Sequence, residues 1–448
     1  MDWCTLIDTT RLGSEDSNKK DNRNSFDRDF DRILFSKEFR LLQAKTQVVP
    51  FPEYDATHTR LTHSLETSSV GRSLGTMVSE RLSLEKKCMC KNEDIGAIVS
   101  AACLCHDIGN PPLGHSGEDA ISQFFKDEKG SRILSEKLTK DQRYDFENFE
   151  GNAIGFHLLT HSDPVKTKLM GGLGLTYSTL AAFVKYPNRK GKSDENSDLA
   201  FTKKSGLLWS DVRTFKKVTD KLGIKGIGDN VWCRHPLAYL TEAADDICYA
   251  VIDLEDGYKN GSLSFECASE LLINLIKQDK RTSIDHYNSI LSNDEKMGYL
   301  RAKAINALID LCVDAFVENN MAILDGTFKA TLVKSITPEA KKVYGEITKI
   351  EVQRVYTHEK ILLTEAAGFV VLPGLLDIFT SAAFEDSKRS NKIKECILKD
   401  LICEDEALPY EEKNYNTLLN IVTFVALMTD NHAVKLYREL TGTQLPNY

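Results

Sequence analysis

The sequence has little of what marks membrane, secreted and basic nucleic-acid-binding proteins. No apolar stretch approaches the ~18 residues that cross a bilayer, and the N-terminus lacks the basic and then apolar order of a signal peptide. The 11 cysteines are an odd number without the spacing of a disulfide scaffold. A formal net charge of −9 argues against a globally basic nucleic-acid binder. We therefore expect a protein of the reducing cytoplasm that has no membrane partner.

Strand patterns are also scarce. Apolar residues recur at helical spacing through most of the 448 residues, and only the stretch 168–175 resembles a hairpin. We predict an all-α fold with at most a short hairpin. Because the chain is too long for one ordinary core, we divide it into a polar N-terminal arm (1–26), a central helical domain (27–260) and a C-terminal helical region that packs on that domain (261–448). The polar stretch 188–204 is expected to be a loop.

The most informative stretch follows a buried apolar helix predicted to end at His106-Asp107. The sequence Gly109-Asn-Pro-Pro forbids further helix, and a new helix then begins with His115 and Glu118. An adjacent His-Asp pair can give one imidazole nitrogen and one carboxylate to the same cation. His115 and Glu118 are three residues apart and share a helical face, where they can hydrogen-bond. This pattern is typical of a metal-dependent hydrolase.

A later helix, predicted to begin at Pro236 and run to about Glu255, carries two stripes. Its apolar residues step by three and four and form a core face, whereas Asp245, Tyr249 and Asp253 step by four on a neighbouring face. Two carboxylates and a phenol stacked beside a core face indicate the wall of a pocket. We expect Asp245, rather than its neighbour Asp246, to point inward.

In this order, His63, His106-Asp107 and Asp245 resemble the H…HD…D signature of the HD-domain metallohydrolases. The surrounding residues narrow the resemblance to the bacterial deoxyguanosine triphosphate triphosphohydrolases. They are Arg60-Leu-Thr-His-Ser-Leu-Glu, His106-Asp-Ile-Gly-Asn-Pro-Pro-Leu-Gly-His, Phe149-Glu-Gly-Asn-Ala and Arg234-His-Pro-Leu-Ala-Tyr-Leu-Thr-Glu-Ala-Ala-Asp-Asp-Ile-Cys-Tyr. The resemblance is close from about residue 27 to 258 and looser beyond. It implies an HD-domain helical core for the central domain.

The resemblance implies a catalytic centre. Its metal ligands would be His63, His106, Asp107 and Asp245, and two imidazoles with two carboxylates suit one divalent Mn²⁺, Fe²⁺, Co²⁺ or Mg²⁺ ion per subunit. In that family, water attacks the α-phosphate of a deoxynucleoside triphosphate and intact triphosphate is released. His115, supported by Glu118, would then be the general acid for the 5′ oxygen. Arg60 would neutralise charge on the α-phosphate.

The resemblance also implies substrate contacts, with dGTP as the leading substrate. Gln47 and Val48 would form a gate at the 3′-OH. Tyr249 would be a sugar platform that excludes a 2′-OH, and Asp253 would accept from the 3′-OH. Lys185, Tyr186 and Lys204 would bind the β- and γ-phosphates. Two positions depart from many relatives, which have Arg in place of His157 and an aromatic residue in place of Ser205. The family forms hexamers, and some members bind single-stranded DNA, which gives the basic residues Arg28, Arg32, Arg40 and Lys45 a second interpretation besides a solvated or interface face.

Other functions stay open. The same metal site could serve a phosphodiesterase or a guanosine tetraphosphate hydrolase, and the chain could be a catalytically idle nucleotide sensor or DNA-binding scaffold. The Tyr249 and Asp253 stripe favours the triphosphohydrolase. The other histidines are interpreted as structural, although His58 is close enough to the metal motif to support it. They are His58, His161, His235, His286, His358 and His432.

Overall fold

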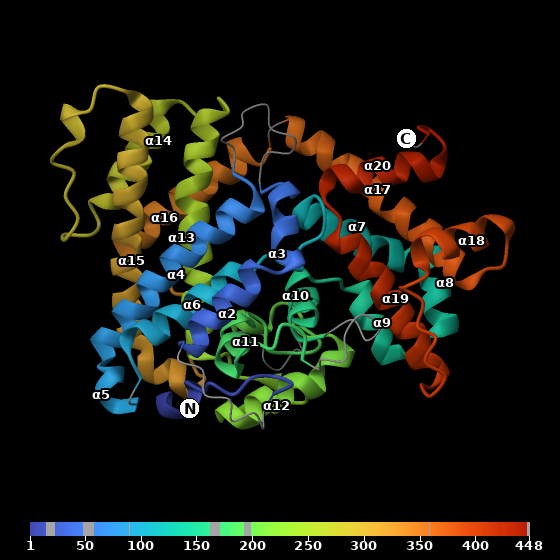
Figure 1. Ribbon diagram of the computed structural model, residues 1–448. Helices are drawn as coiled ribbons and strands as arrows, with labels where there is room; N and C mark the ends of the chain where they lie inside the picture. The colour runs from blue at the N-terminus through green and yellow to red at the C-terminus, as the bar shows by residue number, and fades with distance from the viewer. Residues whose placement is uncertain are drawn as a thin grey trace.

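The computed structural model describes residues 1–14, 23–47, 58–88, 90–161, 171–191, 199–357 and 359–445, and these residues are mainly helical (Figure 1). The all-α prediction is confirmed. The first half of the chain forms α1 (Trp3–Leu6), α2 (Ser25–Leu34), α3 (Lys37–Leu41), η1 (Leu42–Ala44), α4 (Arg60–Leu82), α5 (Leu84–Cys88), α6 (Asn92–Cys105), α7 (Gly114–Lys126), α8 (Glu128–Lys137), α9 (Lys140–Glu147), α10 (Gly151–Thr160), α11 (Tyr177–Phe183), η3 (Ala200–Thr202), η4 (Trp209–Asp211) and α12 (Val212–Leu222).

The second half contains the longest helices. They are α13 (Pro236–Lys259), α14 (Phe265–Ile276), η5 (Tyr287–Ser289), α15 (Asn293–Asp325), α16 (Pro338–Ile350), the π-helical turn η6 (Glu351–Val355), α17 (Glu359–Phe384), α18 (Lys388–Ile393), the π-helical turn η7 (Lys394–Leu398), α19 (Tyr410–Leu427) and α20 (Asp430–Thr441). Pro236 occupies the first turn of α13, where its missing N–H costs nothing, and His235 caps the helix by accepting from the Leu237 amide.

One small hairpin is present in the described part of the chain, but not at 168–175. Strand β1 (Gly226–Gly228) pairs antiparallel with β2 (Val231–Trp232). Residues 168–170 lie outside the described residues, and 171–175 form a turn rather than a strand. The glycines at 171, 172 and 174 have positive φ angles, which suit a turn and not an extended strand. Of the loop expected at 188–204, residues 192–198 lie outside the described residues.

Helices α4, α6 and α13 pack together and position the candidate site. Every residue of α6 from Ile95 to Cys105 except Ala97 is buried, as the continuous apolar run predicts. A buried helix must find neighbours on every side, and α6 contacts α2, α4, α11 and α13. Its C-terminal end therefore lies inside the molecule, which is where His106 and Asp107 follow.

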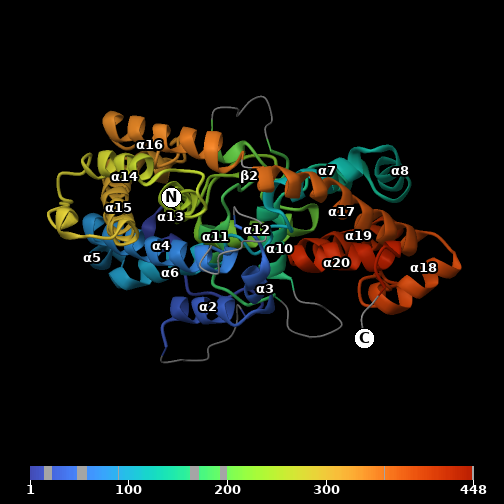
Figure 2. The same ribbon diagram turned by 90° about the horizontal axis from the view of Figure 1, so that it is seen from above.

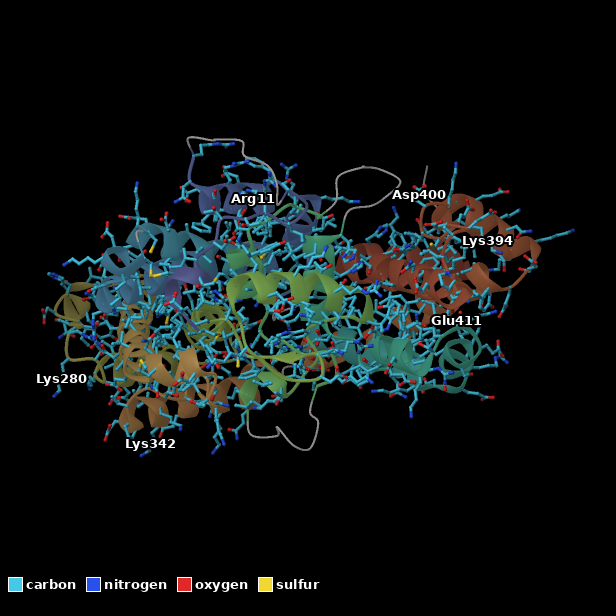
Figure 3. The ribbon with its side chains drawn as sticks, turned by 90° about the horizontal axis from the view of Figure 1, so that it is seen from below. Arg11, Lys280, Lys342, Lys394, Asp400 and Glu411 are labelled. Carbon is cyan, nitrogen blue, oxygen red and sulfur yellow. A yellow bond between two sulfur atoms is a disulfide. The ribbon has the colours of Figure 1, made fainter. Side chains whose placement is uncertain are left out.

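Two hydrophobic cores lie one after the other along the elongated molecule (Figure 2). The first core lies between α4, α6, α13 and α15. It also includes Trp3 and Leu6 of α1, so the first described residues pack against it. The second joins α7, α8 and α10 to α17 and α19. Charged side chains such as Lys280, Lys342, Lys394 and Glu411 lie at the periphery (Figure 3). The candidate site lies where elements of both cores meet.

Helix α17 contains the one segment in the described residues, 361–384, that is long and apolar enough to cross a membrane, so the expectation that no apolar stretch approaches this length is wrong. Its mean hydropathy is 1.8, and 39% of the window is buried inside the protein. Leu372, Leu375, Leu376 and Phe379 are fully buried against the second core. These contacts account for the apolar residues in the second half of α17, whereas Leu363 and Val370 in its first half are exposed. The absence of a membrane partner stays a prediction.

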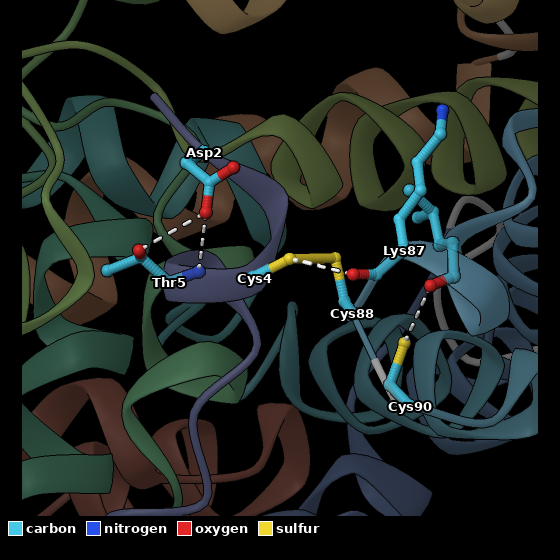
Figure 4. Close-up of a disulfide and its surroundings, with 7 residues drawn as sticks. Asp2, Cys4, Thr5, Lys87, Cys88 and Cys90 are labelled. Atoms are coloured by element: carbon cyan, nitrogen blue, oxygen red, sulfur yellow. Dashed lines mark hydrogen bonds between the residues drawn. A yellow bond between two sulfur atoms is a disulfide. The ribbon is translucent and has the colours of Figure 1, made fainter.

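One pair of cysteines differs from what a reducing cytoplasm predicts. Cys4 of α1 and Cys88 of α5 form a disulfide, which joins the first helix to the region after α4 (Figure 4). Cys103, Cys105, Cys248 and Cys312 are buried free thiols, as their apolar neighbours predict. Sequence spacing gave no sign of the pair because Cys4 and Cys88 are 84 residues apart.

Candidate active site

Local sequence explains how the candidate ligands of α4 and α6 are held near helix ends. Thr59 caps α4 in a reciprocal capping box with Thr62, which fixes Arg60 and His63 in the first turn. His106 is the C-cap of α6, and its Nδ1 lies 2.6 Å from the Cys103 carbonyl oxygen. This contact orients the ring so that Nε2 faces the site. Asp245 comes from the middle of α13, which packs against both helices.

Three of the four expected ligands converge closely. His63 Nε2 lies 3.1 Å and His106 Nε2 lies 3.3 Å from the same oxygen, Asp245 Oδ1. Asp107 Oδ1 is 3.5 Å from His106 Nε2 and completes the group. Donor atoms of His63, His106 and Asp245 all lie within 4.8 Å of one another. The His106 Nε2 atom is buried and makes no hydrogen bond by strict geometry to any described residue. The two imidazoles and two carboxylates of this group are a ligand set that suits a divalent cation.

The charges in this group are strongly coupled. Burial alone would raise the pKa of Asp107, but Arg60 and His106 hold it below its usual range. Burial also opposes ionisation of Asp245, yet the two histidines hold its pKa well below that of an ordinary carboxyl. For His106, burial is outweighed by Asp107 and Asp245, which raise its pKa to about 9. Two ionised carboxylates therefore face imidazoles, and a cation would take the place of the protons.

Arg60 connects this group to the start of α7. Its Nη1 donates to Asp107 Oδ2 at 2.8 Å, and the side chain is 5% exposed. The buried Nε has no hydrogen-bond partner in the described part of the chain. Gly114 has a φ of +60°, and a Cβ there would lie 2.9 Å from Arg60 Nη2. Glycine thus allows the α7 N-terminus, with His115, to approach the guanidinium.

His115 and Glu118 form the expected pair. His115 Nδ1 lies 3.0 Å from Glu118 Oε2, and the imidazole is 84% exposed whereas the carboxylate is 8% exposed. Glu118 Oε1 accepts from the Gly151 amide at 2.8 Å. The hydrogen bond to Glu118 raises the pKa of His115. Burial would raise the pKa of Glu118, but His115 and Lys204 lower it.

Lys204 lies at the same place. Its Nζ is 2.8 Å from Glu150 Oε2 and 3.6 Å from Glu118 Oε2. Lys185 makes a different contact, with Nζ 3.6 Å from Glu242 Oε1 and 5.8 Å from the centre of the Tyr186 ring. Lys204 therefore lies beside His115 and Glu118, and Lys185 beside the Arg234–Glu242 ion pair.

Tyr249 and Asp253 occupy the polar stripe of α13. The Tyr249 ring centre is 4.8 Å from that of His63, so the phenol lies against the metal-ligand group. Asp253 is 2% exposed and accepts a hydrogen bond from the Tyr356 hydroxyl. Burial raises the pKa of Asp253 to about 7. Tyr356 follows η6, and the sequence offered no periodic signal for this partner.

The remaining expected residues have different surroundings. Both polar atoms of the Gln47 amide are buried without a hydrogen-bond partner among the residues described. Val48 lies outside the described residues. Ser205 is buried and donates to the Arg189 carbonyl at 2.8 Å, a structural contact. His157 is hydrogen-bonded to Asp211 at 3.0 Å, away from the metal-ligand group.

The sequence does not predict the role of Lys45, which is expected on a solvated or subunit-interface face or at a single-stranded DNA site. It is 2% exposed, and its Nζ donates at 2.6 Å to the carbonyls of Asn110 and Ala426. Burial lowers its pKa to about 7. Asp430 of α20 binds the amides of Thr46 and Leu113 at 2.8 and 3.0 Å. The C-terminal helices thus fix the turn between α6 and α7, a long-range contact that no local pattern reports.

Comparison with known sequences first gives the class of the protein. The family model described as "HD domain" matches residues 60–193. That range begins at Arg60 and contains His63, His106, Asp107, His115 and Glu118. The chain is therefore an HD-domain protein, which agrees with the paired histidines and aspartates of the site.

Full-length relatives then give the family. The chain is 39% identical over 450 aligned positions to a "Deoxyguanosinetriphosphate triphosphohydrolase-like protein" of Pseudomonas aeruginosa, with 100% of each chain covered. A protein of the same name in Synechocystis is 37% identical, covering 99% of this chain and 100% of the relative. A "Deoxyguanosinetriphosphate triphosphohydrolase" of Yersinia enterocolitica is 28% identical over 94% of both. The chain belongs to the deoxyguanosinetriphosphate triphosphohydrolase family within the HD superfamily.

Proposed function

We propose that this protein hydrolyses deoxynucleoside triphosphates, dGTP first among them, to the deoxynucleoside and inorganic triphosphate. The observation that carries the proposal is the convergence of His63, His106 and Asp245, with Asp107 held by Arg60. The names of the relatives support dGTP as the first substrate to test. The proposal places attack at the α-phosphorus, with cleavage of its bond to the 5′ oxygen.

His63, His106, Asp107 and Asp245 would hold one divalent ion of Mn²⁺, Mg²⁺, Co²⁺ or Fe²⁺. When bound, the ion would supply positive charge for the α-phosphate and lower the pKa of bound water. Arg60 lies beside this group with a buried, unpartnered Nε among the described residues. Its guanidinium can therefore donate to a phosphate oxygen while Nη1 keeps its contact with Asp107.

His115 would give its proton to the leaving 5′ oxygen. The imidazole is exposed and lies at the end of α7 that approaches Arg60. Glu118 holds its Nδ1, which leaves Nε2 for the substrate. Since this hydrogen bond raises the pKa of His115, a larger fraction of the imidazole is protonated near neutral pH.

The sugar would lie on Tyr249 with Asp253 and Gln47 near its 3′-OH. Gln47 has an unpaired donor and an unpaired acceptor, at described positions, that a hydroxyl could satisfy. Asp253 already accepts from Tyr356, so the 3′-OH would use the second lone pairs of that carboxylate. The half-buried Tyr249 ring would leave no room for a 2′-OH, which favours deoxynucleotides.

Lys204, Lys185 and Tyr186 would bind the β- and γ-phosphates. The Lys204 ammonium group lies beside the carboxylates of Glu150 and Glu118, and the Lys185 ammonium group lies beside that of Glu242. Phosphate oxygens could replace these contacts because they carry more charge. Movement of Lys204 away from Glu118 would also strengthen the hold of Glu118 on His115.

The proposal is tested by product analysis. The metal-loaded protein is incubated with each of the four deoxynucleoside triphosphates and with GTP, singly and in pairs, in Mn²⁺ and in Mg²⁺. Anion exchange should separate intact triphosphate and deoxynucleoside. Monophosphate with pyrophosphate would contradict cleavage of the bond to the 5′ oxygen. Faster turnover of ribonucleotides or of guanosine tetraphosphate would favour the other HD hydrolases. No turnover in any mixture would favour the nucleotide sensor or DNA scaffold.

A further inference from the structure

A second group of metal-type side chains lies outside the HD site. His157 and His161 are one helical turn apart at the C-terminal end of α10, and Asp211 comes from η4, just before α12. Donor atoms of these three residues all lie within 4.8 Å of one another. The group shares no residue with the HD ligands. Sequence reasoning had interpreted His161 as structural and had noted His157 only as a departure from relatives.

The distances are close to those of a coordination shell. His157 Nδ1 lies 3.0 Å and His161 Nδ1 lies 3.4 Å from Asp211 Oδ1. Metal–ligand bonds of about 2.0–2.2 Å place neighbouring ligand atoms about 3.0–3.5 Å apart. The two imidazole rings lie nearly parallel, with centroids 4.2 Å apart and an interplanar angle of 21°. Both rings therefore present the same nitrogen to the same carboxylate, and only a small adjustment is needed to bind one ion.

An independent observation points to a missing ligand. Asp211 is 0% exposed, and its Oδ2 atom is buried with no hydrogen-bond partner among the described residues. The other oxygen, Oδ1, accepts from the Ser210 hydroxyl at 3.1 Å and lies beside both imidazoles. A buried acceptor without a donor costs about 1–3 kcal/mol. A cation next to the carboxylate would interact with Oδ2, for which the described residues supply no donor.

The site can also be reached. The side chain of His161 is 39% exposed, so an ion can enter from solvent and keep water in its remaining coordination positions. The Thr160 hydroxyl lies 3.2 Å from His161 Nδ1 and gives this nitrogen a second neighbour in the metal-free protein. Two imidazoles and one carboxylate favour Zn²⁺, Co²⁺ or Ni²⁺ over Mg²⁺ and Ca²⁺, which prefer oxygen ligands.

We propose that His157, His161 and Asp211 bind a divalent transition metal, of the Zn²⁺ class, as a second and structural site. The ion would join the end of α10 to η4 and α12. Gly151 is the first residue of α10, at the opposite end of the helix, and its amide donates a hydrogen bond to Glu118. The second metal would thereby fix the helix that supports the catalytic pair. This inference is independent of the substrate proposed above.

The test counts metal ions in the full-length protein. Each variant is stripped with chelator, dialysed against Zn²⁺, passed through gel filtration, and analysed by mass spectrometry of the metal. The wild type should hold two ions per chain, His106→Ala one, His161→Gln one, and the double variant none. His432→Gln, a change of an exposed histidine on α20, is the matched control and should hold two. Since His161 is partly exposed, its glutamine variant should fold, which circular dichroism checks.

A thermal measurement gives a second readout. In the His106→Ala background, Zn²⁺ should raise Tm, and Asp211→Asn, which keeps the shape of the side chain, should remove that increase. A wild type with one ion, or a His161→Gln variant with as many ions as the wild type, would overturn the proposal. The three residues would then be a hydrogen-bonded cluster without metal.

Discussion

Removing the His115 imidazole tests the assignment of the proton donor. His115→Ala deletes a side chain that is 84% exposed and that is hydrogen-bonded to Glu118. Folding should therefore be little affected, and the whole loss should appear in turnover. General acids contribute about 10²–10⁴-fold, so we expect kcat to fall by at least ~10²-fold, or about 2.7 kcal/mol of barrier. Metal content should stay at the wild-type level.

The partner variant Glu118→Gln separates proton donation from positioning. Glutamine keeps an oxygen that can accept from the Gly151 amide but removes the negative charge. Because the bond to Glu118 raises the pKa of His115, the pKa of His115 should fall in this variant. The protonated fraction then decreases at a lower pH, and the alkaline limb of kcat/KM should move to lower pH. Loss of activity should be smaller in mild acid than in mild alkali.

The assay is steady-state hydrolysis of dGTP from pH 5.5 to 9, with Tm and metal content measured on the same preparations. His432→Ala serves as the control, since His432 is exposed and its backbone amide, not its imidazole, bonds to the Thr429 cap. Unchanged kcat in His115→Ala with full metal content would refute the role of His115. An unshifted pH profile in Glu118→Gln would refute the coupling between the two residues.

Three further changes probe other parts of the site. Asp107→Ala should abolish turnover and remove the catalytic ion, because it deletes a ligand and leaves Arg60 buried without its partner; metal analysis beside activity checks this, and turnover with full metal would contradict it. Gly151→Ala would place a Cβ 2.3 Å from Asn110 Oδ1 and 2.8 Å from Glu118 Oε1. We therefore expect urea unfolding to show a loss of about 1–3 kcal/mol in unfolding free energy, together with a lower kcat. Wild-type values of both would contradict this steric argument. Burial raises the pKa of Asp253 to about 7, so its carboxylate form increases as pH rises through 7; KM for dGTP should fall over that range, and Asp253→Asn should remove the trend.

The helical fold followed from local rules. The apolar run 95–104 gave a buried helix, and Gly109 with Pro111 and Pro112 ended it where His106 and Asp107 are needed. The four-residue step of Asp245, Tyr249 and Asp253 placed all three on one face of α13, and the structure puts Asp245 and Tyr249 beside His63. These features depend on spacing within one helix, which the sequence carries directly.

Contacts between distant segments could not be predicted in this way. The burial of Lys45 depends on Ala426, and the hydrogen bond of Asp253 depends on Tyr356, which lies 103 positions away. The pairing of Cys4 with Cys88 and the approach of Asp211 to His157 are of the same kind. A cluster of this sort forms only after helices pack, and its members have no common period in the sequence.

Hydrolysis of dGTP in ¹⁸O-labelled water tests the central claim most directly. Attack by water on the α-phosphorus, with loss of the 5′ oxygen, predicts one ¹⁸O atom in the released triphosphate and none in deoxyguanosine. Mass spectrometry of both products measures this. Label in deoxyguanosine would contradict attack on the α-phosphorus, and release of dGMP with pyrophosphate would contradict cleavage of the bond between that phosphorus and the 5′ oxygen.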